Sequence, residues 1–261
     1  MEFQSNQRQF WRLVDAYGAA RQHVIAAGYL AEIAWQQSRD IEAVTETEFL
    51  TQFAWVVLAA GFRDAVVRQK FPGILSAFKD FSSARAIMHQ ELECRKAALA
   101  AFGNRRKIDS ILVAAQRVAK DGFDVIKARL TNGDVPYLQT FPFMGPATSY
   151  HLAKNLGMDV VKPDRHLLRI THATGYDSPE RMCRDIGTFV GERLSVVDLV
   201  LWRYATLNPT YLEDFGIVAT NSRTTRLSPP SRGFALSARI WNCPRIVHEE
   251  LTHLRNRGTQ Y

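Results

Sequence analysis

The chain has few cysteines and no long apolar run, and both absences exclude classes of protein. Cysteine occurs only at Cys94, Cys183 and Cys243 in 261 residues. This sparse, odd set does not form a disulfide framework, and it cannot supply the four thiolates of an iron–sulfur cluster or a zinc ribbon. No stretch approaches the roughly 18 apolar residues that a membrane helix needs. We therefore expect no metal centre of that kind and no membrane partner.

The start of the sequence does not have the pattern of a secretory leader, so we expect none. The segment from Met1 to Asn6 has no basic residue followed by an apolar block. With 46% hydrophobic and 23% charged residues, the composition is that of an ordinary globular protein. We expect a monomer in the cytoplasm, associated with the nucleoid if the source is prokaryotic.

Positive charge exceeds negative charge, and the excess is unevenly placed. Lys and Arg number 33 against 26 Asp and Glu, so the net charge is +7. The stretch from Asn221 to Tyr261 has seven arginines, no lysine and two glutamates, which makes +5 of that total. Such a stretch is either a solvated basic tail or a segment that lies along a nucleic-acid backbone.

Nearly all of the sequence has the apolar spacing of helices. Apolar residues recur every three or four positions, and the alternation typical of strands is almost absent. Thr45 and Glu48 form a capping-box pattern at the start of one helix, and Pro72 predicts the start of another segment. The sequence therefore predicts an all-α fold.

The stretch from Phe141 to Thr171 carries the features that point to chemistry. A tight turn over residues 142–146 separates two short helical segments. We expect Gly145 to adopt a backbone conformation closed to other residues and to let another chain come close. The amides that follow open a helix, so they make an anion site suited to a phosphate. Asp164 begins the next helix, about eighteen residues downstream.

These features resemble the helix–hairpin–helix DNA glycosylases, the superfamily that includes endonuclease III and the glycosylases for mispaired adenine, 8-oxoguanine and alkyladenine. The family pattern is Leu-Pro-Gly-Val-Gly, then any residue, then lysine or another residue, then Thr-Ala, and about eighteen residues later Val-Asp-x-His-x-x-Arg. The chain matches this pattern at Phe141, Pro142, Gly145, Thr148, Asp164, His166 and Arg169. The order of the upstream helices fits as well, and the resemblance covers about residues 45–207. Phe143 stands in place of the first hairpin glycine.

The resemblance implies two helical lobes with a cleft between them. Residues 1–80 would supply N-terminal helices to the first lobe, and residues 81–160 would form the second lobe, with the hairpin at about 141–148. Residues 161–220 would carry the aspartate helix and return to the first lobe. Residues 221–261 would form a basic C-terminal segment.

The resemblance also implies a monofunctional hydrolytic enzyme. Ala147 lies where bifunctional members carry the lysine that attacks the sugar, so no Schiff base can form there. Asp164 is then the catalytic candidate, because a carboxylate near the anomeric carbon stabilises positive charge in the transition state or takes a proton from the attacking water. The implied partner is double-stranded DNA with an altered base, which is flipped out and excised to leave an abasic site.

Cofactors are limited by the same resemblance. The cysteine cluster that the family usually carries at its C-terminus is missing. We expect that no cofactor is required, and the family leaves room for a monovalent cation, Na⁺ or K⁺, at the hairpin.

Base flipping requires a clamp on the DNA backbone and a wedge in the duplex. The candidate clamp consists of the backbone amides of Met144, Gly145, Ala147 and Thr148. Phe62, on the turn at residues 60–63, is the candidate wedge, and Arg63 beside it is a candidate phosphate contact. The candidate base pocket is formed by Tyr150, His151, Trp35 and Trp55.

Each candidate has a structural alternative. Asp164 could be only a helix N-cap, and His166 could be only a hydrogen-bonding partner near the helix start. Phe62 and the two tryptophans could belong to the core, and Tyr150 and His151 could have core or capping roles. Arg63 could pair with its neighbour, Asp64.

Two other functions stay open at the level of the sequence. One is a helix–hairpin–helix protein that binds DNA and has lost catalysis. The other is a bifunctional glycosylase and lyase that uses a displaced amine, for which Lys162 is the candidate. Borohydride trapping of a DNA adduct would distinguish the lyase, and base release would distinguish the binding protein.

Overall fold

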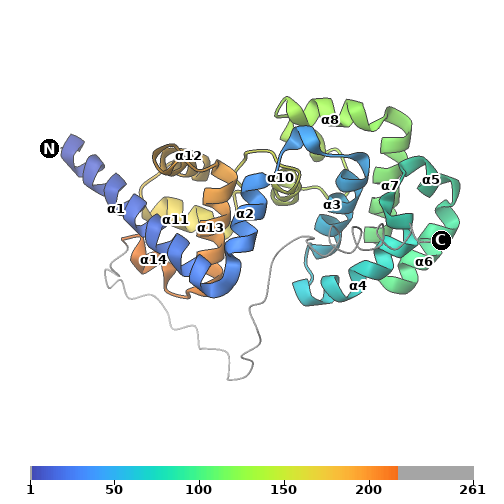
Figure 1. Cartoon of the computed structure of the whole chain (residues 1–261), viewed down its shortest axis with the longest axis horizontal. Helices are drawn as coiled ribbons and strands as arrows, with labels where there is room; N and C mark the ends of the chain where they lie inside the picture. Colours follow the sequence, from blue (N-terminus) through green and yellow to red (C-terminus); the bar gives the residue numbers. More distant parts are fainter. Residues whose placement is uncertain (1, 217–261) are drawn as a thin grey trace, which may run out of the picture. The chain divides into compact units, whose positions relative to one another are not determined.

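The structure, a computed structural model, describes residues 2–216, and this part of the chain is helical with no β-strand (Figure 1). The predicted all-α class is therefore confirmed. None of the described helices is long and apolar enough to cross a membrane. The predicted basic segment, residues 221–261, lies outside the described residues.

The described chain divides into two compact units. Unit 1 contains residues 2–37 and 163–216, and unit 2 contains residues 38–162. We expected residues 38–80 in the first lobe, and this boundary is wrong. The reason is the packing of α3 (Glu46–Ala59). This helix contacts α7 (Arg105–Asp121) and α10 (Pro146–Asn155), which both belong to unit 2.

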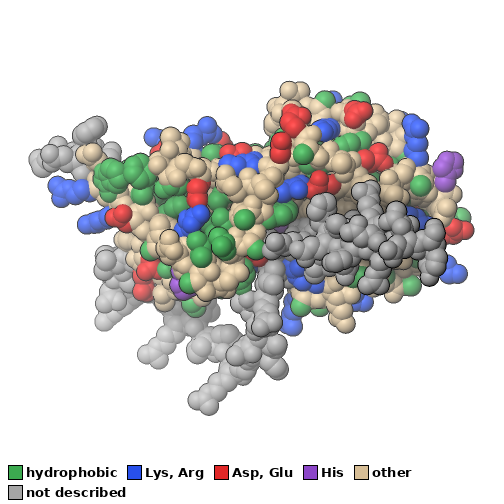
Figure 2. All heavy atoms as spheres, in the orientation of Figure 1, with side chains coloured by type: hydrophobic (Ala, Val, Ile, Leu, Met, Phe, Trp, Pro, Cys, Tyr) green, Lys and Arg blue, Asp and Glu red, His purple; other side chains and the backbone are tan. Residues whose placement is uncertain are grey.

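Unit 1 is a bundle in which α1 lies along α13 and in which α13 also contacts α11 and α12 (Figure 1). A short π-helical segment with Gly28 at φ +92° bends the chain between α1 and α2, because only glycine adopts this conformation without strain. Hydrophobic side chains gather on its surface over α1 and α12 (Figure 2), where Trp11 and Phe189 pack with ring centroids 5.0 Å apart. Its helices are α1 (Glu2–Val24), η1 (Ile25–Tyr29), α2 (Leu30–Ser38), α11 (Arg165–Ala173), α12 (Pro179–Val190), α13 (Leu194–Leu207) and α14 (Tyr211–Asp214).

Unit 2 is built around α3 and α7, which have the most buried side chains of the helices in this unit. Thr45 caps α3 by accepting a hydrogen bond from the Glu48 amide at 3.2 Å, as the capping-box pattern predicts. The helices of this unit are η2 (Ile41–Ala43), α3, α4 (Asp64–Ala77), η3 (Lys79–Phe81), α5 (Ala84–His89), α6 (Glu91–Ala101), α7 (Arg105–Asp121), α8 (Phe123–Thr131), α9 (Val135–Leu138) and α10 (Pro146–Asn155).

The helix break predicted at Pro72 is wrong, because α4 continues through this residue. The next residue, Gly73, explains part of the difference. A Cβ atom at Gly73 would lie 3.0 Å from the Cβ of Ala101, so the glycine lets α4 pack closely on α6. Tertiary packing thus outweighs the local preference of proline to end a helix.

A buried ion pair joins α2 and α13 inside unit 1. The Arg203 guanidinium donates to both carboxylate oxygens of Glu32, at 2.5 to 3.0 Å, and both side chains are only 4% exposed. The guanidinium also lies 4.2 Å from the ring centroid of Tyr29 and 4.8 Å from that of Trp202. Three hydrogen bonds and two aromatic faces compensate for the loss of water around the charges.

We predict that Glu32→Leu lowers the free energy of unfolding by about 3–5 kcal/mol, because it leaves the Arg203 guanidinium buried without its carboxylate. Urea unfolding followed by circular dichroism measures the change. Combining Glu32→Leu with Arg203→Met removes both charges and should recover most of the loss. A double variant as unstable as the single one would contradict this account.

Candidate functional site

The turn between α9 and α10 is held firmly against the body of unit 2. The Phe141 ring is 2% exposed and lies 6.0 Å from the ring of Phe49 and 5.7 Å from that of Phe53, both on α3. From α7, the Ser110 hydroxyl donates a hydrogen bond of 3.0 Å to the carbonyl of Pro142. The base of the turn therefore belongs to the core, while its tip is exposed.

Phe143, at the tip, adopts a backbone conformation that favours glycine. Its φ is +65°, whereas Gly145 has an ordinary extended conformation with φ −80°. The expectation for Gly145 is thus wrong, and the left-handed residue is the one that replaces the first hairpin glycine of the family. A Cβ atom at Gly145 would still meet nothing within 4 Å, so the space beside it is open.

The first amides of α10 form part of the predicted clamp. No described side chain caps the start of this helix, and the amides of Gly145, Ala147 and Thr148 make no hydrogen bond to a described residue. The Met144 amide is different, since it donates to the carbonyl of Phe141 at 3.3 Å, and its side chain is buried. Met144 is therefore removed from the clamp, and three amides remain available to an anion.

The carbonyl groups of the turn are poor ligands for a cation. The Phe141 carbonyl accepts from the Met144 amide, and the Pro142 carbonyl accepts from Ser110. The Thr148 hydroxyl donates to the carbonyl of Phe143 at 3.0 Å. A Na⁺ or K⁺ ion here would have to share these oxygens with hydrogen-bond donors, so the residues do not fit the ion well. No group of three or more His, Cys, Asp or Glu that could hold a metal occurs among residues 2–216.

Lys107, in the first turn of α7, ties the end of α3 to the tip of the hairpin. Its side chain is buried, and its Nζ donates to the carbonyl oxygens of Ala60 at 2.6 Å and Leu58 at 3.4 Å, and also to that of Val57. These carbonyls end α3 and have no partners within the helix, so the ammonium acts as a cap. Burial lowers the pKa of Lys107.

The same ammonium lies beneath two exposed aromatic rings. Its Nζ is 5.2 Å from the ring centroid of Phe62 and 5.3 Å from that of Phe143. Phe62 is 39% exposed and Phe143 is 42% exposed. Phe62 is therefore not a core residue. Its ring also contacts that of Phe102, with centroids 5.1 Å apart.

Arg63, next to Phe62, is exposed and precedes α4 without capping it by its side chain. This placement is compatible with a phosphate contact. The alternative ion pair involves the side chain of Asp64, which lies outside the described part of the structure.

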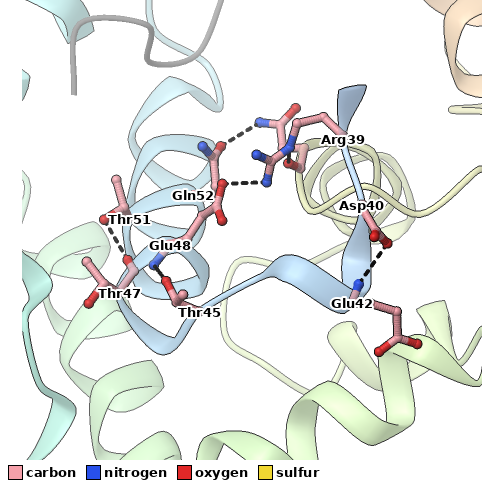
Figure 3. A network of polar contacts seen from close by, with 9 residues as sticks. Arg39, Asp40, Glu42, Thr45, Thr47, Glu48, Thr51 and Gln52 are labelled. Carbon is pink, nitrogen blue, oxygen red and sulfur yellow. Dashed lines mark hydrogen bonds and ion pairs between the residues drawn. The ribbon is translucent and has the colours of Figure 1, made fainter. Parts of the chain in front are cut away.

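The C-terminal end of α10 is anchored by a polar network (Figure 3). Arg39 donates to the carbonyl of Asn155 at 3.0 Å and pairs with Glu48 of α3 at 2.5 Å. The Asn155 amide in turn donates to Gln52 at 3.0 Å. A Cβ atom at Gly157 would lie 2.7 Å from backbone atoms of Asp40, which follows α2. Only glycine allows the two segments to come this close. Both ends of α10 are thus fixed within unit 2.

Asp164 lies in unit 1, where it caps α11. Its Oδ1 accepts hydrogen bonds from the amides of His166 at 2.9 Å and Leu167 at 3.1 Å. The side chain is half-buried, and its second oxygen, Oδ2, makes no hydrogen bond to a described residue. The capping role is therefore real, and it leaves one carboxylate oxygen available to another molecule.

His166 has a structural position beside this cap. Its Nδ1 lies 3.3 Å from the hydroxyl of Tyr211, a buried residue of α14, and Arg165 donates to its Nε2 at 3.3 Å. Both ring nitrogens are thus engaged, which favours the structural reading of His166.

The four candidate pocket residues are not gathered in one unit. Trp35 is a half-buried residue of α2 in unit 1, and Tyr150 and His151 are half-buried residues of α10 in unit 2. Trp55 is 5% exposed and packs 5.0 Å from the ring of Phe71, with Arg68 over its face at 5.4 Å. Trp55 is therefore a core residue, and its assignment to the pocket is corrected.

Sequence reasoning missed Lys107 and the role of Phe143. One signal was present for Lys107, because a run of three cations follows Asn104 at the start of α7, where the helix dipole disfavours positive charge. For Phe143 the signal was its position, because the family pattern has the first hairpin glycine there. This position indicates a left-handed residue only if the turn has the same backbone shape as in the family.

We predict that Asp164→Ala lowers the free energy of unfolding by about 0.5–2 kcal/mol, because two backbone amides lose their acceptor. Asp164→Asn keeps a side-chain oxygen and should stay close to the wild type. Thermal unfolding of the three proteins measures this difference. Equal losses in both variants would show that the cap does not depend on Oδ1.

A second prediction concerns pH. Burial holds the pKa of His151 well below its usual value of 6.5, and the charges of Lys162 and Lys154 lower it further. Below pH 6.5 the unfolded chain gains a proton on this ring that the folded chain does not, so stability should fall as the pH decreases from 7 towards 5. His151→Gln should flatten this part of a plot of unfolding free energy against pH. An unchanged slope would exclude His151 as its source.

Comparison with known proteins does not assign the chain to a family. No protein-family model, no curated protein and no solved structure matches the chain. The resemblance to helix–hairpin–helix glycosylases rests on the residues of the chain itself.

Proposed function

We propose that the chain is a monofunctional DNA glycosylase that removes a damaged, mispaired or modified base by hydrolysis. The observation that carries this proposal is the state of Asp164. Two backbone amides hold Oδ1 in place, and Oδ2 has no hydrogen bond to a described residue. A carboxylate that is positioned in this way needs no rearrangement before it acts.

In the proposed reaction a single carboxylate stabilises the positive charge that develops on the sugar. As the bond between C1′ and the base nitrogen lengthens, positive charge builds on the sugar ring. The Asp164 carboxylate stabilises this charge and can take a proton from the attacking water. The water oxygen bonds to C1′, the bonding electrons leave with the base, and the base nitrogen is protonated. The product is an abasic site in an otherwise intact strand.

Features of unit 2 support DNA as the partner. The uncapped amides of Gly145, Ala147 and Thr148 suit a backbone phosphate. The exposed Phe62 ring suits the gap that a flipped base leaves, and Arg63 beside it suits a neighbouring phosphate. The net charge of the chain is +7, which is opposite in sign to the charge of the DNA backbone.

The side chains near the turn favour hydrolysis over a lyase reaction, because a lyase needs an amine nucleophile. Ala147 is exposed and offers no amine at the family's lysine position. Lys107 is near the hairpin, but three carbonyl groups accept from its ammonium, which makes it a structural cap rather than a nucleophile.

We predict that the protein releases a free base from duplexes that carry single altered bases. The panel should include alkylated, deaminated and hypermodified bases, with mass spectrometry of the released base and alkaline heating to cut abasic sites. Asp164→Asn should lower the excision rate by roughly 100-fold or more while folding normally.

Matched controls separate this proposal from its alternatives. Ala147→Lys and wild type are compared by borohydride trapping, and wild-type protein should give no trapped adduct. A trapped wild-type adduct that Lys162→Ala removes would identify the lyase. Salt-sensitive DNA binding that Asp164→Asn does not change, without base release from any duplex, would identify a binding protein.

A further inference from the structure

Phe143 combines an unfavourable backbone with an exposed ring. A bulky side chain at φ +65° is strained, and such strain persists only where the surrounding structure enforces it. Burial does not explain the residue, since 42% of it is exposed. Besides its contact with the Lys107 ammonium, the Phe143 ring keeps a large exposed surface, and this surface can contact another molecule.

A second ring is held at the same place. Phe62 comes from the turn after α3, far from the hairpin in sequence, yet both ring centroids lie within 5.3 Å of the Lys107 ammonium. That ammonium is itself fixed by the carbonyl groups at the end of α3. The two rings are therefore presented together on a rigid support within unit 2.

We propose that Phe62 and Phe143 together form a stacking surface for nucleobases of DNA that is locally opened. This inference rests on the proposed function for its partner and goes beyond it, because the wedge assigned there is a single ring. The stacking surface defined by these two rings takes any exposed base, since every base offers an aromatic face.

Charge around the rings favours a nucleic acid over a second copy of the chain. Arg63 follows Phe62, and Arg105 and Arg106 directly precede Lys107; all three arginines are exposed. Arg105 pairs with Asp109 at 3.6 Å, so Arg63 and Arg106 are the cations adjacent in sequence that favour a polyanion over an identical surface.

The hairpin offers groups for both halves of a nucleotide. Phe143 presents an aromatic face, and the amides of Gly145 and Ala147, which make no hydrogen bond to a described residue, follow at the start of α10. A ligand that carries a flat base and a phosphate on one sugar matches this combination. The replacement of the family's glycine by phenylalanine would then add base stacking to a turn that otherwise holds only the backbone.

The test uses Phe143→Gly, because glycine adopts a positive φ without strain and the variant should unfold no earlier than wild type. Phe62→Ala removes the second ring, and Leu92→Ala, at an 80% exposed site of α6, is the control. Binding is measured by fluorescence anisotropy over a salt series, with a duplex that contains an abasic-site analogue beside an unpaired 2-aminopurine.

We expect Phe143→Gly and Phe62→Ala each to weaken binding roughly tenfold, while the slope of log affinity against log salt stays that of wild type. Quenching of 2-aminopurine by the wild-type protein should decrease in both, and Leu92→Ala should match wild type. Wild-type affinity and quenching in Phe143→Gly would overturn the stacking surface. So would a change in oligomeric mass with unaltered DNA affinity.

The outcomes also separate this inference from the proposed function. If the wild-type protein excises a base and the ring variants bind as tightly as wild type, the stacking surface fails and the glycosylase stands. If the wild-type protein neither binds these duplexes at low salt nor releases a base, both fail together.

Discussion

The buried ammonium of Lys107 is the interaction on which the arrangement of unit 2 depends. It supplies donors to carbonyl groups that α3 leaves unsatisfied at its end, and it lies against the rings of Phe62 and Phe143. A buried ammonium is tolerated only when its donors are satisfied, so the turn after α3 must stay where its carbonyls reach Lys107. The ammonium thereby fixes the turn after α3 and lies beside the turn between α9 and α10, which Ser110 holds by a hydrogen bond.

Asp164 caps α11 through one carboxylate oxygen, and the proposed chemical role uses the other oxygen of the same side chain. The helix cap uses only Oδ1, since the amides of His166 and Leu167 both donate to that atom. The cap orients the carboxylate, and Oδ2 makes no hydrogen bond to a described residue. A structural role of Asp164 therefore does not argue against the proposed catalytic role, because the cap would hold the carboxylate in one position.

Local signals were read correctly where local physics decides. The capping residue Thr45 begins a helix as predicted, because its side-chain oxygen accepts a hydrogen bond from the amide of Glu48. Asp164 was identified on its position at a helix start. Predictions failed where distant contacts decide: Pro72 lies inside a helix that packs closely on α6, and Trp55 is covered by neighbours from α4.

The sequence by itself determined the helical class, the capping residue Thr45 and the helix start at Asp164, because these depend on residues within a few turns of each other. The tertiary structure alone decided that residues 38–80 belong to unit 2 and that Phe143 takes the left-handed conformation. It alone brought Phe62, Lys107 and Phe143 together. These three come from segments about 40 residues apart, and only the packing of α3 and the hairpin on α7 sets their separation.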